Sequence, residues 1–233
     1  MHILFCGAHP DDVELNAGGL AYKLRKEGVY ILDLTRGELA TNGTDEERIQ
    51  EAYNSAKILG AKQRIILDLG DSKIENSYEN RIKIIEVIRK VRCDLLVIPY
   101  HYDRHPDHIK ANQIIKDSSF YSGLVKIRTR FYKPFRPKLI LYYLNFSMVQ
   151  SDIIIDISKE FNQKMKAIKA FKYQFYQPNI RKKKSFISSK DFLESLEVKA
   201  RYWGSQIGVK YGEAYCIDKP FRLDNPLNLW SIK

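Results

Sequence analysis

Cysteine is scarce in this sequence and forms no motif. The three cysteines, Cys6, Cys93 and Cys216, are odd in number and include no C-x-x-C pair. We therefore expect neither a disulfide framework nor a cysteine-ligated metal. Cys6 and Cys93 lie in or beside apolar runs and are predicted to be small buried hydrophobic side chains. This usage favours a reducing compartment, and we expect a cytoplasmic protein.

Long apolar runs and targeting signals are also missing. No stretch approaches the roughly 20 apolar residues that a membrane-spanning helix needs. The chain enters a strand-like run at once, without the charged and apolar regions of a secretory signal. We therefore expect no signal peptide and no membrane partner.

Acidic residues are the minority among the charges. The sequence holds 39 Lys and Arg against 28 Asp and Glu, a net charge of +11. The excess concentrates in residues 126–138, 164–172 and 181–184. A solvated surface is the simplest explanation. Basic residues interleaved with aromatics in 126–138 suggest a nucleic-acid-binding protein as the alternative, but that function leaves the placement of the histidines unexplained, so no nucleic-acid partner is expected.

The first half of the chain alternates between strand-like and helix-like segments. The predicted strands are 2–8, 29–35, 65–69 and 95–98, and the predicted helices are 12–27, 44–59, 76–91 and 107–120. This alternation predicts an α/β fold, with a Rossmann-like open, mainly parallel sheet, helices on both faces and the core strand order 3-2-1-4. Neither a G-x-G-x-x-G motif nor a P-loop follows the first strand, so the usual nucleotide cradle is missing.

The second half is predicted to add strands and helices to the same unit. The expected elements are strands at 138–144 and 153–157, helices at 158–175 and 191–202, and a final strand within 203–217. A polar, basic excursion is expected over 177–190, and an irregular tail from residue 220. Nothing in the composition marks a boundary, so residues 1–233 are predicted to be one domain.

Histidine is rare but clustered. Of five histidines, four lie in two loops that each follow a strand-like run: His9 in the first, and His101, His105 and His108 in the second. Both loops contain the string His-Pro-Asp. In the strand order 3-2-1-4, the first and fourth strands are neighbours, and ligands bind in the crevice at their carboxyl ends. We therefore expect the two loops to meet.

Two imidazoles and one carboxylate are a sufficient ligand set for a catalytic zinc ion. The loops offer His9, His108 and one member of the pair Asp11-Asp12. The other aspartate would serve as the base that hydrolysis requires, and the residues by themselves leave open which aspartate has which role.

A hydrolase also needs a donor for the negative charge that develops on the substrate oxygen. His105 is the candidate, with Asp107 to orient it and stabilise its charged form. Helix capping is the simpler explanation for the Asp11-Asp12 pair. Capping alone, however, needs neither the Asp11-Asp12 pair nor histidines on both loops.

Three motifs carry a resemblance to a known family. They are Ala8-His9-Pro10-Asp11-Asp12-x-Glu14, Gly18-Gly19 and His105-Pro106-Asp107-His108. They resemble the zinc-dependent N-acetylglucosaminyl deacetylases of the PIG-L/LmbE superfamily. Residues 42–52 resemble the loop and helix after the second strand of that family. Residues 202–215 resemble the C-terminal segment of its bacillithiol-biosynthesis branch.

The resemblance implies a role for each site residue. The implied ligands of zinc, or of Fe²⁺ as the alternative metal, are His9, Asp12 and His108. The implied catalytic residues are Asp11 as general base, His105 as the group that polarises the amide carbonyl, and Asp107 behind it. Arg48 is implied to contact the substrate.

The resemblance also implies an activity. We expect a metal-dependent hydrolase that removes acetyl from an N-acetylglucosamine conjugate, in first place N-acetylglucosaminyl L-malate in bacillithiol biosynthesis. The partner would be a small anionic amino-sugar conjugate, whose carboxylates Arg104 or Arg128 would bind. The alternative is another N-acetyl amino sugar, such as a chito-oligomer or a glycolipid. Members of this family are often oligomers, so a homo-oligomer is expected.

Overall fold

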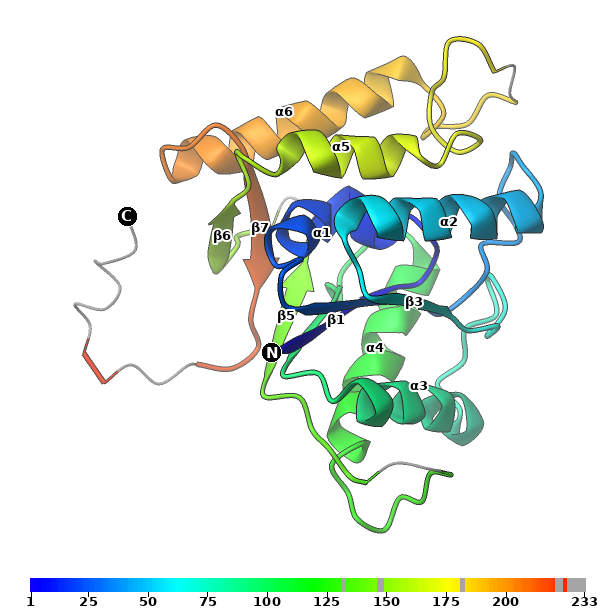
Figure 1. The fold of residues 1–233 in the computed structure, drawn as a ribbon, viewed down its shortest axis with the longest axis vertical. Helices are drawn as coiled ribbons and strands as arrows, with labels where there is room; N and C mark the ends of the chain where they lie inside the picture. Colours follow the sequence, from blue (N-terminus) through cyan, green and yellow to red (C-terminus); the bar gives the residue numbers. More distant parts are fainter. Residues whose placement is uncertain (131–132, 146–148, 181–182, 221–223, 226–233) are drawn as a thin grey trace.

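One seven-stranded sheet forms the centre of the protein (Figure 1). The structure is a computed structural model that describes residues 1–130, 133–145, 149–180, 183–220 and 224–225. The strands are β1 (His2–Gly7), β2 (Gly28–Asp33), β3 (Gln63–Ile66), β4 (Leu95–Pro99), β5 (Leu139–Tyr143), β6 (Ile153–Asp156) and β7 (Gly212–Cys216).

The sheet has the order β3-β2-β1-β4-β5-β7-β6. The first five strands in this order are parallel. β7 runs antiparallel to both β5 and β6. The predicted α/β class and the core order 3-2-1-4 are confirmed. The order matters for function because it makes β1 and β4 neighbours, with Phe5 paired to Val97.

The helices cover both faces of the sheet. They are α1 (Asp12–Lys23), α2 (Asp45–Leu59), α3 (Tyr78–Val91), α4 (Pro106–Tyr121), α5 (Phe161–Lys169) and α6 (Lys190–Gln206). α1 and α2 lie on one face, and α3 and α4 on the other (Figure 1). α5 packs on α1 and α2, and α6 packs against β7, so one face carries a second helical layer.

The alternation of side chains along β1 accounts for the two cores. Ile3 and Phe5 point to the core under α1 and α2. Leu4 and Cys6 point to the core shared with α3 and α4. Because both faces of a central parallel strand are buried, the run is apolar throughout rather than alternating with polar residues. A third apolar cluster joins α1 and α2 to the second layer.

Two predicted helices are too long. The helix expected over 12–27 ends at Lys23, and Gly28 opens β2 instead of capping the helix. A Cβ on Gly28 would lie 2.5 Å from His2 Cδ2, so the close approach of β1 to β2 explains this glycine. The helix expected over 158–175 is confined to Phe161–Lys169, because the turns that follow carry Phe171 and Phe175 into the third apolar cluster.

Local signals for α2 are confirmed. Thr44 Oγ1 accepts the N–H of Glu47, and the Glu47 side chain accepts the N–H of Thr44, which completes the capping box. Gly60 ends the helix with a φ of 71°. This cap matters for the site because α2 carries Arg48.

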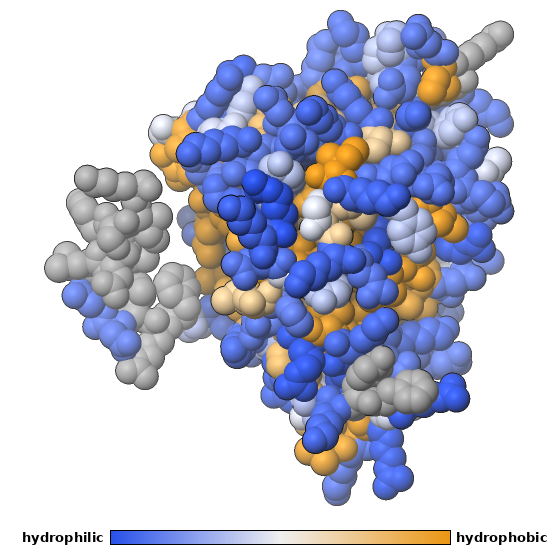
Figure 2. Space-filling view, viewed as in Figure 1, coloured by the Kyte–Doolittle hydropathy of each residue, from blue (hydrophilic) through white to orange (hydrophobic). Residues whose placement is uncertain are grey.

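The outer surface is largely hydrophilic. In Figure 2, hydrophilic residues cover most of the face, and hydrophobic residues occupy smaller areas between them. None of the helices within the described residues combines the length and the apolar composition that a membrane span requires. Parts of the basic segments 126–138 and 181–184, and most of the tail beyond residue 220, lie outside the described residues.

Candidate metal centre

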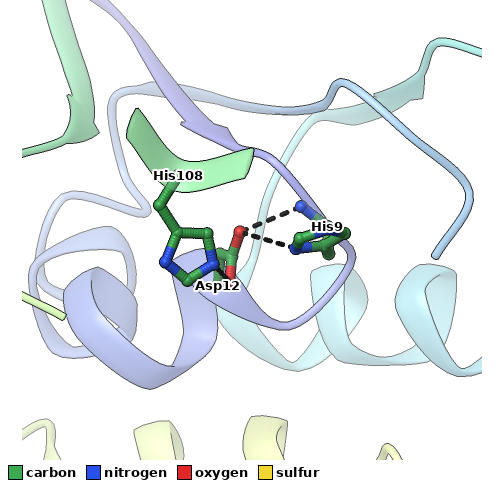
Figure 3. Close-up of side chains that lie close together, drawn as sticks. All are labelled: His9, Asp12 and His108. Carbon is green, nitrogen blue, oxygen red and sulfur yellow. Dashed lines mark hydrogen bonds and ion pairs between the residues drawn. The ribbon is translucent and has the colours of Figure 1, made fainter. Parts of the chain in front are cut away.

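The two His-Pro-Asp loops meet at the carboxyl ends of β1 and β4. The ring centroids of His9 and His108 lie 5.6 Å apart, although the residues come from opposite ends of the first half of the chain. Asp12 lies between the two rings (Figure 3). The expected convergence is therefore present in the structure.

The first loop is shaped to deliver Asp12. The N–H of His9 donates to Asp12 Oδ2 at 2.9 Å, which closes the turn between β1 and α1. Asp11, the residue before the helix, has a φ of 109°. Positive φ costs free energy for a residue other than glycine and is concentrated at functional sites. Gly7 lies behind the turn, where a Cβ would come within 2.9 Å of Asp12 Cβ.

Three buried side chains form the donor set. Asp12 Oδ1 lies 3.1 Å from His108 Nε2, and Asp12 Oδ2 lies 3.6 Å from His9 Nδ1. One ligand atom from each of the three residues falls within 4.8 Å of the others. This spacing and the His₂-carboxylate composition fit a divalent cation such as Zn²⁺.

The second ring nitrogen of His9 faces two carboxylates. Its Nε2 lies 3.2 Å from Asp71 Oδ1 and 3.2 Å from Asp107 Oδ2. A proton on Nε2 leaves the lone pair of Nδ1 directed toward Asp12. Carboxylate partners of this kind fix the tautomer of a metal-binding histidine and raise its basicity.

His108 also has a carboxylate partner. Its Nδ1 lies 3.2 Å from Asp103 Oδ2, an acceptor that favours a proton on Nδ1. Asn145 Nδ2, 2.8 Å from the same nitrogen, is itself a donor. With the proton on Nδ1, the Nε2 lone pair faces Asp12. The carboxylates of Asp71, Asp107 and Asp103 therefore hold both histidines in the tautomer that a metal requires.

The charges around the donor set favour a cation. Burial opposes a charge on His9, but the carboxylates of Asp107, Asp12 and Asp71 outweigh it and raise the pKa of His9. Burial also opposes a charge on His108, yet Asp12 and Asp103 raise its pKa to about 9. A divalent cation would satisfy the same carboxylates that otherwise hold these protons.

Asp11 differs from its neighbour. Burial raises the pKa of Asp11 to about 7, although the Arg48 guanidinium lowers it. The pKa of Asp12 is held well below its usual value, because the charges of His108 and His9 outweigh the effect of burial. A general base works best with a pKa near the working pH. The environment thus separates the pair that the sequence left open, with Asp12 in the donor set and Asp11 beside it.

His105 and Asp107 are arranged differently from the prediction. The Asp107 carboxylate contacts His9 Nε2 and the N–H of Ser72, not the ring of His105. It is the backbone N–H of Asp107 that donates to His105 Nδ1, at 3.2 Å, because His105 caps α4. Burial, followed by the charges of His108 and His9, lowers the pKa of His105. His105 is therefore neutral, with its proton on Nε2.

A cleft of about 380 Å³ opens over this centre. The residues that line it include Asp11, Arg48, Arg104 and His105. Arg128 is not among them. Arg89 lies near the C-terminus of α3, just before β4, and donates to residues of the 124–129 segment. That segment therefore lies at the amino ends of the strands, away from the cleft. The suggestion that Arg128 binds a substrate carboxylate is therefore wrong.

Sequence reasoning missed Asp71, Asp103 and Asn145. Each lies in the segment that follows a parallel strand: β3, β4 and β5 respectively. Polar residues just after buried strands are a usable signal, because the carboxyl ends of parallel strands share one edge of the sheet. That signal does not reveal which of these residues would reach a histidine.

The sequence is similar to those of known deacetylases. The family model described as PIG-L, GlcNAc-PI de-N-acetylase, matches residues 4–119, which include both loops. The diacetylchitobiose deacetylase of Thermococcus kodakarensis is 31% identical over 189 residues, covering 74% of this chain and 70% of the relative. The chain belongs to the PIG-L family of deacetylases.

Two further proteins are similar to the chain. A crystal structure of the conserved protein TT1542 from Thermus thermophilus superposes with a TM-score of 0.86 and 30% identity, covering 96% of this chain and 97% of the other. A probable N-acetyl-alpha-D-glucosaminyl L-malate deacetylase of Bacillus subtilis is 25% identical, over 74% of this chain and 83% of the relative. The sequence identity to this malate deacetylase is lower than that to the diacetylchitobiose deacetylase.

Proposed function

We propose that this protein is a metal-dependent N-deacetylase of N-acetylglucosamine conjugates. One observation carries the proposal: His9, Asp12 and His108 converge in the wall of a cleft that Asp11 and His105 also line. The donor set, the base and the oxyanion donor that amide hydrolysis requires are thus within one site.

The residues fit a divalent cation held by His9, Asp12 and His108. Zn²⁺ is the first choice, and Fe²⁺ also suits a His₂-carboxylate set. Such a cation would supply Lewis acidity, polarising the amide carbonyl and making water a better nucleophile. The remaining chemistry belongs to side chains of this chain.

Asp11 is assigned the proton transfers. Its carboxylate takes a proton from the attacking water as the new C–O bond forms at the acetyl carbon. It returns that proton to the amide nitrogen as the C–N bond breaks. The products are acetate and the free amine. Its raised pKa of about 7 suits both directions of transfer.

His105 is assigned the oxyanion. Because its Nδ1 accepts the N–H of Asp107, the neutral ring presents Nε2–H as a donor. A fixed donor of this kind stabilises the negative charge that develops on the carbonyl oxygen. Asp107 would then act through position and charge near His9, with its backbone rather than its carboxylate orienting His105.

Two substrates follow from the relatives. The sequence resemblance favours N-acetylglucosaminyl L-malate, whose carboxylates Arg104 in the cleft would attract. The relative with 31% identity is named for diacetylchitobiose, which has no carboxylate. The proposal ranks the malate conjugate first and diacetylchitobiose second.

Acetate release tests the proposal. Metal-loaded protein is incubated with N-acetylglucosaminyl malate, diacetylchitobiose and N-acetylglucosamine, and acetate and free amine are measured together. We expect equal amounts of both products from at least one conjugate. The Asp11→Ala variant should keep its metal and lose about 10²-fold or more of the rate. Absence of product from every conjugate, with metal bound, would overturn the proposal.

A further inference from the structure

A second cavity adjoins the metal centre. It has a volume of about 220 Å³ and shares Asp12, Leu15 and His108 with the catalytic cleft. The other side of the cavity is formed by α6 and by the segment before it. Asp12, Leu15 and His108 thus line both spaces, which adjoin at the candidate ligands.

The second cavity is lined mainly by hydrocarbon. Leu15, Phe186, Phe192 and Leu196 contribute aliphatic and aromatic surface to it. Phe186 and Phe192 meet edge to face, with ring centroids 5.4 Å apart. The larger share of the exposed lining is apolar. Such a surface favours an apolar guest.

The polar side chains in its wall are engaged with the protein. Lys199 Nζ donates to Leu144 O and to Asn145 O, and also to Asn16 Oδ1 at 3.3 Å. Those contacts account for the three N–H donors of the ammonium. Ser195 Oγ donates to Phe192 O at 2.7 Å. A sugar ring with several hydroxyl groups would find few donors here, although Asn145 Oδ1 is one buried acceptor without a partner among the described residues.

The catalytic cleft has the opposite character. Thr41, Arg48, Ser72, Arg104 and Gln174 line it. Hydroxyl, guanidinium and amide groups of this kind suit an amino sugar and its polar aglycone. If the sugar occupies the cleft with its amide at the candidate ligands, the acyl group lies beside Asp12, Leu15 and His108, where the cleft adjoins the apolar cavity.

We propose that this cavity is an acyl pocket that admits unbranched N-acyl groups longer than acetyl. A buried water needs roughly 10–15 Å³, and a methyl group is of similar size, so acetyl would use only a small part of about 220 Å³. The substrate class is therefore N-acyl amino sugars whose acyl group extends at least to butyryl. This inference rests on the proposed deacetylase function and extends its range of substrates.

The rim of the cavity can be altered without disturbing the core. Ser195 is exposed on α6, and Phe186 is 61% exposed. The Arg104 guanidinium lies 4.5 Å from the centre of the Phe186 ring, which joins the rim to the catalytic cleft. Ser195 is thus the position at which added bulk would narrow the pocket most selectively.

The first test is an acyl-chain series on the metal-loaded wild-type protein. We measure kcat/KM for N-acetyl, N-propionyl and N-butyryl forms of the same glucosamine conjugate. Each added methylene should raise kcat/KM about fourfold, which corresponds to about 0.8 kcal/mol for a buried CH₂. A flat or falling series would overturn the acyl pocket.

The second test uses variants of α6. Ser195→Phe should lower kcat/KM for the butyryl substrate tenfold or more and leave the acetyl substrate within about twofold. Ser195→Ala removes the hydroxyl without adding bulk, and Val198→Phe adds bulk at a 65% exposed position outside the pocket. Both controls should keep the wild-type butyryl-to-acetyl ratio. Equal losses on both substrates in Ser195→Phe would contradict the proposal.

A binding measurement separates this inference from the proposed function. Calorimetric titration of the metal-free protein follows affinity along the same acyl series without turnover. Affinity should rise with each methylene, with an increasingly negative heat-capacity change. Rising affinity without hydrolysis would remove the deacetylase proposal and leave the pocket. Hydrolysis of the N-acetyl substrate with no gain in affinity along the series would remove the acyl pocket and leave the deacetylase proposal.

Discussion

Arg48 Nη2 lies 3.0 Å from Asp11 Oδ2 and 2.7 Å from the carbonyl oxygen of Pro10. One guanidinium nitrogen from α2 thus binds both the side chain of the candidate base and the turn that carries it. This contact stabilises a residue whose φ of 109° is otherwise unfavourable. Arg48 is therefore a positioning residue for Asp11, and its contact with substrate stays a prediction.

Arg48→Ala should lower kcat about 10- to 100-fold, because the base loses its orientation, while KM changes little. Metal content should stay at the wild-type level. Arg48→Lys is the matched control: it keeps the charge but lacks the planar guanidinium that directs Nη2 at both acceptors, so an intermediate kcat is expected. Steady-state kinetics decides the matter. A rise confined to KM would make Arg48 a substrate-binding residue instead.

Asp103→Asn should weaken metal binding about 10- to 100-fold, because the carboxylate that orients His108 becomes a neutral amide. Zinc affinity is measured by competition with a chromophoric chelator. Asp191→Asn, at an exposed position at the start of α6, is the control and should bind zinc like the wild type. Unchanged affinity in Asp103→Asn would show that His108 does not depend on this partner.

Gly7→Ala should disturb the metal centre through packing. The added Cβ would lie 2.9 Å from Asp12 Cβ and 3.0 Å from His9 O, so the turn must shift. We expect about 1–3 kcal/mol less stability and weaker zinc binding. Gly208→Ala provides the comparison: its φ of 71° makes a side chain unfavourable, but a Cβ there meets nothing within 4 Å. That variant should lose stability and keep its zinc affinity; equal affinities in both variants would refute the packing argument.

Because of Lys199, the free energy of unfolding should rise as the pH is raised above 7. Burial lowers the pKa of Lys199 to about 7 from its usual 10.5. Below pH 7 Lys199 is protonated in both the folded and the unfolded chain. Between pH 7 and pH 10.5 only the unfolded chain keeps the proton, so raising the pH increases the free energy of unfolding. Urea unfolding in chelator at pH 7, 8 and 9 should show the stability of the wild type rising relative to that of Lys199→Met. Parallel profiles would show that Lys199 has a normal pKa in the folded state.

The sequence predicted the first half of the fold well because its signals are local. Apolar strands, the Thr44 capping box and the αL glycine at position 60 are each decided within a few residues. The helix expected over 158–175 failed for the opposite reason. Phe171 and Phe175 continue the apolar pattern past α5, but they are buried by packing against α6, which lies far along the chain. Periodicity does not show that a chain has turned.

The candidate site divides in the same way. The donor set could be proposed because two His-Pro-Asp strings follow two strands that the topology makes neighbours. The histidine that contacts the Asp107 carboxylate could not be predicted, because His9 and His105 are both near it. The structure shows that the carboxylate contacts His9, whereas His105 Nδ1 accepts the backbone N–H of Asp107. Asp71 and Asp103 follow β3 and β4, but that position does not show which aspartate reaches a histidine, so their roles were missed.

A zinc titration of four proteins tests the central claim most directly. Metal-free wild type and the variants His9→Ala, Asp12→Ala and His108→Ala are titrated under the same conditions. We expect the wild type to bind one zinc ion per chain and each variant to bind at least about 100-fold more weakly, because each removes one of three protein ligands. Wild-type affinity in all three variants would show that the two loops do not share an ion.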